Sequence, residues 1–362
     1  MKNILHVSFS MDTGGGPITI KRIVEDFPKY NHFVVGNEGV FMKGFRHTLR
    51  PEKVKNLKGW NLVYNLWLLV RLVKTWNIDV LHLHGRGAAS FGRFVRLFRK
   101  IKVIYTPNGF FPNSLPWYFR GLYVIGERIL LGLTNIVFFV SESEKQTYVK
   151  SLRLRPTNPR LVVVQNYLNL ERSDYETVLP FTHQTDKKIK FLFIGRLSRQ
   201  KGVDILLESI KRLTYKDYHL TIIGYGEMEE YLKSEIRKKD LSDNVTFEGK
   251  INEAFRLMPH FDALLLPSRF EGLPFTILEA MVYKLPVIGT PCNGSVDLLR
   301  GGHGYMSRDV GVKSYLDAIF EFLNDFEKRP AEIAAMVERN HIKLIDCYTL
   351  RAVKEKINLI YS

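Results

Sequence analysis

The first half of the chain alternates short apolar runs with longer segments whose apolar residues recur at helical spacing. Several of the short runs are continuously apolar, which is typical of strands buried on both faces of a parallel sheet. These runs cover residues 4–9, 33–35, 80–84, 103–106, 136–141 and 161–164, and helical spacing covers residues 61–76 and 116–132. This alternation predicts a doubly wound α/β domain over residues 1–180.

The second half repeats this pattern after a polar, turn-prone stretch at residues 181–188, which we interpret as a linker. Strands are predicted at residues 189–194, 220–224, 245–247, 263–267 and 286–289, with helices at 203–213, 228–239 and 276–282. They indicate a second α/β domain over residues 189–345, and a chain of 362 residues is long enough for two cores. Residues 346–362 are expected to form a helix that packs back toward the first domain. Because open α/β sheets bind ligands beyond the carboxyl ends of their strands, we expect a substrate cleft between the two domains.

Residues 267–280, PSRFEGLPFTILEA, place two glutamates around the start of a predicted helix. Proline is tolerated in a first helical turn, so Glu271 falls in the preceding loop and Glu279 inside the helix. A helix N-terminus attracts a diphosphate through its free N–H groups and its dipole, and carboxylates on either side can hold hydroxyls. Glu279 would lie roughly 7 Å along the axis from the helix start. This layout fits a nucleotide sugar, in which ribose, diphosphate and hexose follow one another.

Two further loops follow predicted strands and suit phosphate groups. Residues 195–202 read GRLSRQKG, where Arg196 offers a planar guanidinium and Lys201 a mobile ammonium to a diphosphate. The alternative is a basic loop that only caps the next helix, and the loop lacks the ending of a P-loop. After the first strand, Gly15 and Gly16 let backbone N–H groups approach phosphates or sugar, although bare glycines also suit a flexible loop tip.

Two histidines share one face of the strand predicted at residues 80–84, because His82 and His84 are two positions apart. A zinc site is disfavoured because no third ligand follows at a characteristic spacing. One histidine is expected to be satisfied in the core, whereas His84 at the strand's carboxyl end can face the cleft.

Positive charge is concentrated in the first half of the chain. Residues 1–180 carry 26 Lys and Arg against 12 Asp and Glu, a net charge of +14, whereas residues 181–362 carry 27 against 25, a net charge of +2. Apolar and basic residues interleave at 66–74 and 91–100, which suits a peripheral contact with an anionic membrane. The alternative is an ordinary amphipathic helix that packs its Phe side inward with Arg in solvent. Nucleic acid is disfavoured as a partner, because no zinc-finger spacing or RNA-binding signature accompanies the charge.

Cysteine content and hydropathy indicate a cytoplasmic location. Two cysteines in 362 residues and no secretory-type N-terminus argue against a disulfide framework. The longest uncharged apolar run, residues 129–141, has 13 residues, below the roughly 18–20 that a membrane-spanning helix needs.

Together these motifs resemble the family 4 retaining glycosyltransferases of GT-B fold. The likeness rests on the glycine-rich first loop, GRLSRQKG, GYGE, VTFEGK and the two glutamates of PSRFEGLPFTILEAM, and it is strongest over residues 189–300. It implies two Rossmann-like domains that face each other across a cleft. The domain of residues 1–180 would bind the acceptor and the domain of residues 189–345 the nucleotide sugar. Neither a metal nor a cofactor is implied beyond the nucleotide-sugar co-substrate.

The resemblance also implies roles for single residues. Arg196 and Lys201 would bind the diphosphate, Glu279 the ribose, and Glu271 the transferred sugar and the developing charge. The catalytic set implied is therefore Glu271, Arg196 and Lys201. Further donor contacts are implied for Gly15, Gly16, Gly249, Lys250, Gly272 and Leu273, and acceptor or sugar contacts are expected at His84 and Asn108.

Three positions depart from the family pattern. Asn108 in YTPNGF stands where many relatives have histidine, and an amide can donate a hydrogen bond to a hydroxyl but cannot act as an acid or base. Lys284 replaces a common glycine, and Tyr167 stands where relatives often have glycine. These changes concern the acceptor side and leave the expected fold and donor binding in place.

The sequence therefore predicts hexose transfer, with retention, from a nucleoside-diphosphate sugar to a growing glycan, with UDP as the expected carrier. The expected acceptor is linked to a polyprenyl diphosphate, in surface-polysaccharide or lipopolysaccharide synthesis at the inner face of the plasma membrane. Two alternatives remain open. One is a nucleotide-sugar epimerase or phosphorylase of the same fold, and the other is a non-catalytic nucleotide- or glycan-binding protein, which Asn108 would favour.

Overall fold

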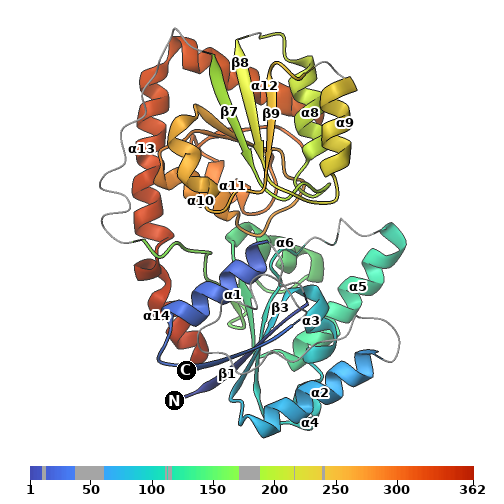
Figure 1. Cartoon of the computed structure of the whole chain (residues 1–362). Coiled ribbons are helices and arrows are strands. Elements are labelled where there is room, and N and C mark those ends of the chain that lie inside the picture. The colour runs from blue at the N-terminus through green and yellow to red at the C-terminus, as the bar shows by residue number, and fades with distance from the viewer. Residues whose placement is uncertain are drawn as a thin grey trace. The chain divides into compact units, whose positions relative to one another are not determined.

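The computed structural model describes residues 1–9, 14–36, 61–110, 112, 116–170, 188–215, 217–238 and 241–362. The chain divides into two compact units, of which the first is Met1–Asn169 with Val353–Ser362 and the second is Leu170–Ala352 (Figure 1). The last ten residues thus belong to the unit formed by the first half. The predicted linker lies outside the described residues, except for Lys188.

The first unit is built on a parallel six-stranded sheet with the strand order β2-β1-β3-β4-β5-β6. The predicted strands all form, with shifts of one or two residues at their ends. The strands are β1 (Asn3–Ser8), β2 (Asn31–Gly36), β3 (Val80–His84), β4 (Lys102–Thr106), β5 (Ile136–Phe139) and β6 (Leu161–Val163). The helices are α1 (Gly15–Asp26), α2 (Asn61–Thr75), α3 (Gly85–Gly92), α4 (Val95–Phe98), α5 (Trp117–Leu130), the 3-10 turn η3 (Leu131–Leu133), α6 (Glu142–Leu152) and α14 (Leu350–Tyr361).

The second unit contains another parallel six-stranded sheet, in the order β12-β11-β10-β7-β8-β9. Its strands are β7 (Ile189–Ile194), β8 (Tyr218–Ile223), β9 (Val245–Gly249), β10 (Ala263–Leu266), β11 (Val287–Gly289) and β12 (Tyr305–Met306). Its helical segments are α8 (Val203–Arg212), α9 (Glu229–Lys238), η4 (Ala254–His260), α10 (Phe275–Val282), α11 (Ser295–Leu299), α12 (Val312–Lys328) and α13 (Pro330–Cys347). Both sheets are therefore of the doubly wound α/β class that the sequence predicts.

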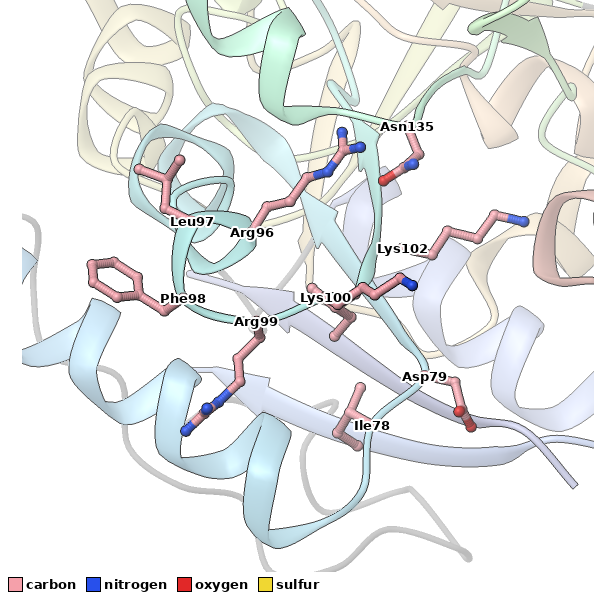
Figure 2. A pocket seen from close by; sticks show the side chains of 10 residues that line it. Ile78, Asp79, Arg96, Leu97, Phe98, Arg99, Lys100, Lys102 and Asn135 are labelled. Carbon is pink, nitrogen blue, oxygen red and sulfur yellow. The ribbon is translucent and has the colours of Figure 1, made fainter.

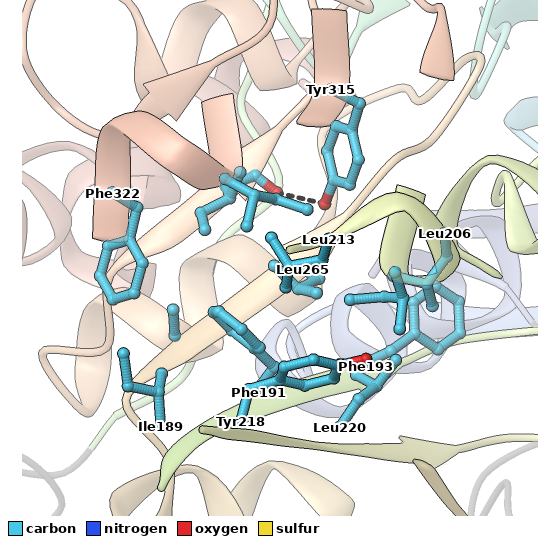
Figure 3. Close-up of a cluster of buried hydrophobic side chains, with 14 of the residues drawn as sticks. Ile189, Phe191, Phe193, Leu206, Leu213, Tyr218, Leu220, Leu265, Tyr315 and Phe322 are labelled. Atoms are coloured by element: carbon cyan, nitrogen blue, oxygen red, sulfur yellow. Dashed lines mark hydrogen bonds between the residues drawn. The ribbon is translucent and has the colours of Figure 1, made fainter. Parts of the chain in front are cut away.

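The core of the second unit is a layer of aromatic and aliphatic side chains between the sheet and its helices (Figure 3). Phe191 and Phe193 of β7 and Phe322 of α12 are fully buried in it. The hydroxyl of Tyr315 donates a hydrogen bond to the carbonyl oxygen of Ile288, 3.0 Å away. Each buried Phe or Leu stabilises the unit by roughly 1.5–3 kcal/mol, so the core holds β7 and β10 firmly beneath the loops at their carboxyl ends.

The first unit buries an ion pair that sequence analysis did not anticipate. Arg93 and Glu127 form two hydrogen bonds of 2.9 and 2.7 Å, and their side chains are 1% and 2% exposed. The hydroxyl of Tyr148 donates to Glu127 at 3.0 Å, and the Arg93 guanidinium lies 4.5 Å from the ring centre of Tyr105. The pair therefore joins the segment after α3 to α5 and α6.

The alternative of one amphipathic helix over residues 91–100, with Phe inward and Arg in solvent, holds only in part, because Phe91 is buried but the helix is interrupted. α3 ends at Gly92 and α4 begins at Val95, so the helical period is interrupted between them. The interruption turns Arg93 into the core and leaves Phe94 and Phe98 37% and 57% exposed. No helix in the described parts of the chain is both long and apolar enough to cross a membrane.

Candidate active site

The loops that carry the sequence motifs meet at one edge of the second sheet. Strands β10, β7, β8 and β9 are neighbours in the parallel sheet, so their carboxyl ends lie along the same edge. The loop at 195–202 follows β7, the turn at 224–226 follows β8, Lys250 follows β9, and the loop at 267–274 follows β10. Ligands of open α/β sheets bind at such an edge.

A buried ion pair lies at the centre of this edge. The Nζ of Lys201 contacts the Oε1 of Glu271 at 2.5 Å, and the hydroxyl of Ser268 donates to the same oxygen at 2.6 Å. Glu271 is only 6% exposed, so water screens this cluster poorly. The sequence motifs at 195–202 and 267–274 are thus brought together as one group of charges.

A second ion pair joins the loop at 267–274 to the loop at 195–202 and the start of α8. Arg269 donates 2.7 Å hydrogen bonds to both carboxylate oxygens of Asp204 and another to the carbonyl of Arg199. Burial by itself raises the pKa of Asp204, but the hydrogen bonds and charge of Arg269, together with the backbone N–H groups of Asp204 and Ile205, outweigh burial, so the pKa is lowered. Gln200 adds a bond of 3.0 Å to the carbonyl of Phe270. Sequence reasoning missed Arg269 and Asp204 because the pair joins residues far apart in the chain, although both flank the recognised motifs.

Two glycines permit the close approach of these loops. Gly202 has a φ of +70°, and a Cβ there would lie 2.0 Å from the carbonyl oxygen of Pro267. Gly224 has a φ of +157°, and a Cβ there would lie 1.9 Å from the carbonyl oxygen of Gly195. Side chains at either position would push the loops apart.

Arg196 and Glu279, the other charged residues of the two motifs, lie on the loop after β7 and in helix α10. Arg196 is exposed on the loop after β7, and Glu279 is half-buried at the fifth position of α10, whose N-cap is Pro274. Helix α10 therefore begins between Glu271 and Glu279, as the sequence motif predicts. Gly272 is half-buried, and Leu273 is 3% exposed.

The expected base-contacting residues lie at the end of β9. Gly249 closes the strand, and its carbonyl accepts a 2.8 Å hydrogen bond from the N–H of Gly224. The exposed Lys250 places its Nζ 4.9 Å from the centre of the Tyr225 ring. These residues thus join the loops after β8 and β9.

In the first unit Gly16, in the first turn of α1, lies beside Asn108. Helix α1 starts at Gly15, and a Cβ at Gly16 would lie 3.2 Å from the Nδ2 of Asn108. Asn108 has a φ of +53°, and the following N–H, of Gly109, donates to Glu144 at 2.5 Å. Gly16, expected to contact the donor, and Asn108, expected to contact the acceptor or sugar, therefore come together at the carboxyl ends of β1 and β4.

A chain of neutral histidines runs through the first sheet. The Nε2 of His32 donates to the carbonyl of Phe27 at 3.0 Å, so its Nδ1 accepts from His6, and His6 in turn accepts from the Nε2 of His84. This order leaves a lone pair on the Nδ1 of His84, which has no hydrogen-bond partner among the described residues. His84 lies at the carboxyl end of β3, as expected, but it is buried, with 3% exposure, and its ring centre lies 5.3 Å from that of His6.

The same histidines include a group with metal-ligand distances. Ring nitrogens of His6, His82 and His84 lie within 4.8 Å of one another. Both nitrogens of His82 are already bonded at 2.7 Å, to the hydroxyls of Tyr361 and Thr106, and both nitrogens of His6 are bonded to other histidines. A metal would have to displace these bonds, so the residues fit a hydrogen-bonded core better than a metal site.

We expect this histidine chain to make the first unit sensitive to acid. Burial lowers the pKa of His32 to about 4 and that of His84 to about 3, from 6.5. The histidines of the unfolded chain bind protons near pH 6.5, whereas those of the folded unit stay neutral to a lower pH. Their contribution to the free energy of unfolding is therefore complete above pH 6.5 and is lost as the pH falls toward 4. Lowering the pH from 7.5 to 5.5 should cost about 1.4 kcal/mol for each of the two histidines. Urea unfolding at both pH values measures the change.

A matched pair of variants separates this effect from general acid sensitivity. His32→Asn should reduce the pH dependence, whereas the same change at the exposed His260 should leave it unaltered. An unfolding free energy of the first unit that is equal at pH 7.5 and 5.5 would contradict the assignment.

Comparisons with known proteins agree with this fold. Residues 28–172 match the family model described as Glycosyltransferase Family 4, and residues 176–336 match the model described as Glycosyl transferases group 1. The structure superposes on Anabaena Alr3699/HepE, solved in complex with UDP and glucose, with a TM-score of 0.79 at 15% identity over 99% of each chain. The two family models and the fold thus define a glycosyltransferase of GT-B fold. The chain belongs to the family 4 glycosyltransferases.

Curated relatives from Escherichia coli align over most of the chain. The O-antigen biosynthesis glycosyltransferase WbnH is 26% identical over 333 residues, covering 91% of this chain and 93% of the relative. A UDP-Gal:alpha-D-GlcNAc-diphosphoundecaprenol alpha-1,3-galactosyltransferase is 25% identical over 293 residues, covering 76% of this chain and 74% of the relative.

Proposed function

We propose that this glycosyltransferase moves a hexose from a UDP-sugar to a glycan linked to a polyprenyl diphosphate, with retention and without a metal. The observation that carries the proposal is the Lys201–Glu271–Ser268 cluster beside Arg196 at the carboxyl edge of the second sheet. The location that fits such an acceptor is the inner face of the plasma membrane, in surface-polysaccharide synthesis.

The proposed chemistry follows from the charges at this edge. Bond breaking places negative charge on the leaving diphosphate, which Arg196, Lys201 and the N–H groups at the start of α10 stabilise. Lys201 neutralises Glu271 when the site is empty and turns to phosphate when the donor binds. Glu271 then accepts hydrogen bonds from sugar hydroxyls, and Glu279 from those of the ribose.

The first unit supplies no acid or base at Asn108. Its amide can donate a hydrogen bond to a sugar hydroxyl, and Gly15 and Gly16 offer backbone N–H groups to the donor. The proton of the attacking acceptor hydroxyl therefore passes to a phosphate oxygen of the leaving group. Such a front-side attack retains the configuration at the anomeric carbon.

The names of relatives guide the choice of substrates. The galactosyltransferase relative is named for a UDP-sugar donor and a diphosphoundecaprenol-linked acceptor, and the Anabaena structure contains UDP and glucose. The basic first half is suited to an acceptor that carries a diphosphate at an anionic membrane.

A thermal-shift screen followed by a transfer assay tests the proposal. UDP at 100 times its dissociation constant should stabilise the protein by about 2.7 kcal/mol, and GDP and ADP at the same concentration should stabilise it less. With a UDP-hexose and a short-chain lipid-diphosphate glycan in EDTA, the product should carry one added hexose with an α linkage by NMR.

Three results would contradict the proposal. Conversion of the UDP-sugar into its epimer without an acceptor indicates an epimerase. Sugar transfer to free phosphate indicates a phosphorylase. Donor binding without any turnover across a broad acceptor panel indicates a binding protein.

A further inference from the structure

Helix α5 turns its apolar stripe toward solvent. Tyr118, Leu122, Ile125 and Ile129 recur at intervals of three and four residues and so lie along one side of the helix. Their exposed fractions are 60%, 68%, 58% and 69%. Single exposed apolar residues are common on protein surfaces, but a continuous stripe of this kind marks an interaction surface.

The first turn of α5 adds two exposed aromatic side chains, one on either side of Tyr118. Trp117 is 84% exposed and Phe119 is 54% exposed. We call Trp117, Tyr118, Phe119, Leu122, Ile125 and Ile129 the α5 face. An exposed Trp and Tyr beside aliphatic side chains are the combination found where proteins enter the interface of a bilayer.

The rotation of α5 is held by its opposite side. Glu127 is buried against Arg93, and Tyr123 stacks on Phe110 with 5.8 Å between ring centres. Turning the helix to bury the α5 face would break this ion pair and leave both charges unpaired. The exposure of the apolar stripe is therefore built into the packing of the first unit.

Helix α4, which packs against α2, adds two exposed apolar side chains. Leu97 and Phe98 are 63% and 57% exposed, and they lie four and five residues after Arg93, the partner of Glu127 on α5. Figure 2 shows Leu97 and Phe98 pointing away from Arg96 and Asn135. The buried ion pair thus ties the segment that leads into α4 to helix α5.

Basic side chains accompany these apolar surfaces. Arg120 and Arg128 are exposed on α5 itself. A cavity of about 770 Å³ beside α4 is lined by Arg96, Arg99, Lys100 and Lys102, with Asp79 as the one acid among its described lining residues (Figure 2). Positive charge beside an apolar face favours an anionic lipid surface over another copy of this basic chain.

We propose that the α5 face, with Leu97 and Phe98, enters the headgroup region of an anionic bilayer while the basic residues contact lipid phosphates. The proposal deepens the proposed function, because it names the element that would bring the enzyme to a membrane-bound acceptor. It keeps part of the sequence-based expectation, which placed membrane contact at residues 66–74 and 91–100, because Leu97 and Phe98 lie in the second of these segments, and it adds α5.

Vesicle co-sedimentation of the full chain tests the proposal without any sugar substrate. The wild type should bind vesicles of phosphatidylglycerol and phosphatidylethanolamine at least tenfold more tightly than phosphatidylcholine vesicles. Leu122→Glu/Ile125→Glu should weaken binding to the anionic vesicles at least tenfold. The matched control, Ile342→Glu/Leu359→Glu, adds the same charge at exposed apolar positions of α13 and α14 and should bind as the wild type does.

Fluorescence places the helix in the lipid. Quenching of tryptophan emission by brominated lipid should be present in the wild type and strongly reduced in Trp117→Phe. Equal vesicle binding by the α5 double variant and the wild type, or no quenching that depends on Trp117, would overturn the proposal. A wild-type dimer that becomes monomeric in the double variant would also overturn it, since the α5 face would then be a contact between copies.

Vesicle binding and UDP binding are measured separately, so the membrane-docking proposal and the proposed function are tested independently. The α5 double variant leaves the loops of the second unit unchanged, so it should bind UDP as the wild type does. Loss of vesicle binding with retained UDP binding supports the docking surface. Vesicle binding that survives in the double variant refutes the docking surface and leaves the donor site unaffected.

Discussion

Glu271→Gln and Lys201→Ala should each lower the turnover number for sugar transfer by at least 100-fold. Both variants remove charge from a poorly screened site, and a group that stabilises developing charge in such a site contributes 10²–10³ in rate. Gln keeps the shape of Glu271 and its contact with Ser268, so the loop should remain in place. Release of UDP in the presence of acceptor measures the turnover.

Arg196→Ala should act in the same direction, with a loss of at least tenfold, because its guanidinium is exposed and more accessible to water. The matched control is Lys211→Ala, which removes an exposed cation from the far end of α8 and should leave turnover unchanged. If Glu271→Gln turned over at the wild-type rate, the assignment of this carboxylate to the transferred sugar would be wrong.

Glu127→Ala should lower the unfolding free energy of the first unit by about 3–5 kcal/mol, the cost of breaking one partner of a buried ion pair. The substitution leaves the Arg93 guanidinium buried with no carboxylate, and it removes the acceptor of the Tyr148 hydroxyl. Urea unfolding followed by circular dichroism measures the loss.

The surface pair between Lys21 and Glu25 is the matched control. Its charges are 3.9 Å apart and largely exposed, so Glu25→Ala should cost less than about 1 kcal/mol. The double variant Arg93→Met/Glu127→Met should recover part of the stability, because paired apolar side chains leave no charge unpaired. A loss below 1 kcal/mol in Glu127→Ala would mean that the ion pair does not hold α5.

Local periodicity was enough to predict the strands and the motif-bearing loops. The strands lie in parallel sheets that helices cover on both faces. Most of them therefore contain a short apolar run and can be recognised from their own sequence. The glutamates of PSRFEGLPFTILEA could be placed around a helix start because proline restricts that turn locally. The close contact of Lys201 and Glu271 depends on β7 and β10 being neighbours in the sheet, which spacing along the chain does not reveal.

The contacts that sequence analysis missed join residues far apart in the chain. Arg269 pairs with Asp204, and Arg93 with Glu127, and neither pair leaves a periodic signal. The solvent-facing stripe of α5 was also missed, because an apolar stripe is normally taken to face the core. Only the burial of Glu127 reveals which side of the helix packs inward.

Two of the residues that depart from the family pattern, Lys284 and Asn108, have a positive φ in the structure. Lys284 has a φ of +52°, a backbone conformation that glycine adopts at no cost, and its Nζ contacts Glu338 at 2.7 Å. Asn108 also has a positive φ, which asparagine tolerates better than most residues. Tyr167 is buried with 3% exposure, and nothing in the structure explains why a large ring stands there.

The central claim is that the charged edge of the second sheet binds the diphosphate of the donor. Calorimetric titration of UDP and of uridine into the wild type and Arg196→Ala tests it directly, because uridine lacks the diphosphate. The account predicts that the wild type binds UDP far more tightly than uridine and that Arg196→Ala weakens only UDP, by at least tenfold. Equal affinity of the two proteins for UDP would contradict it.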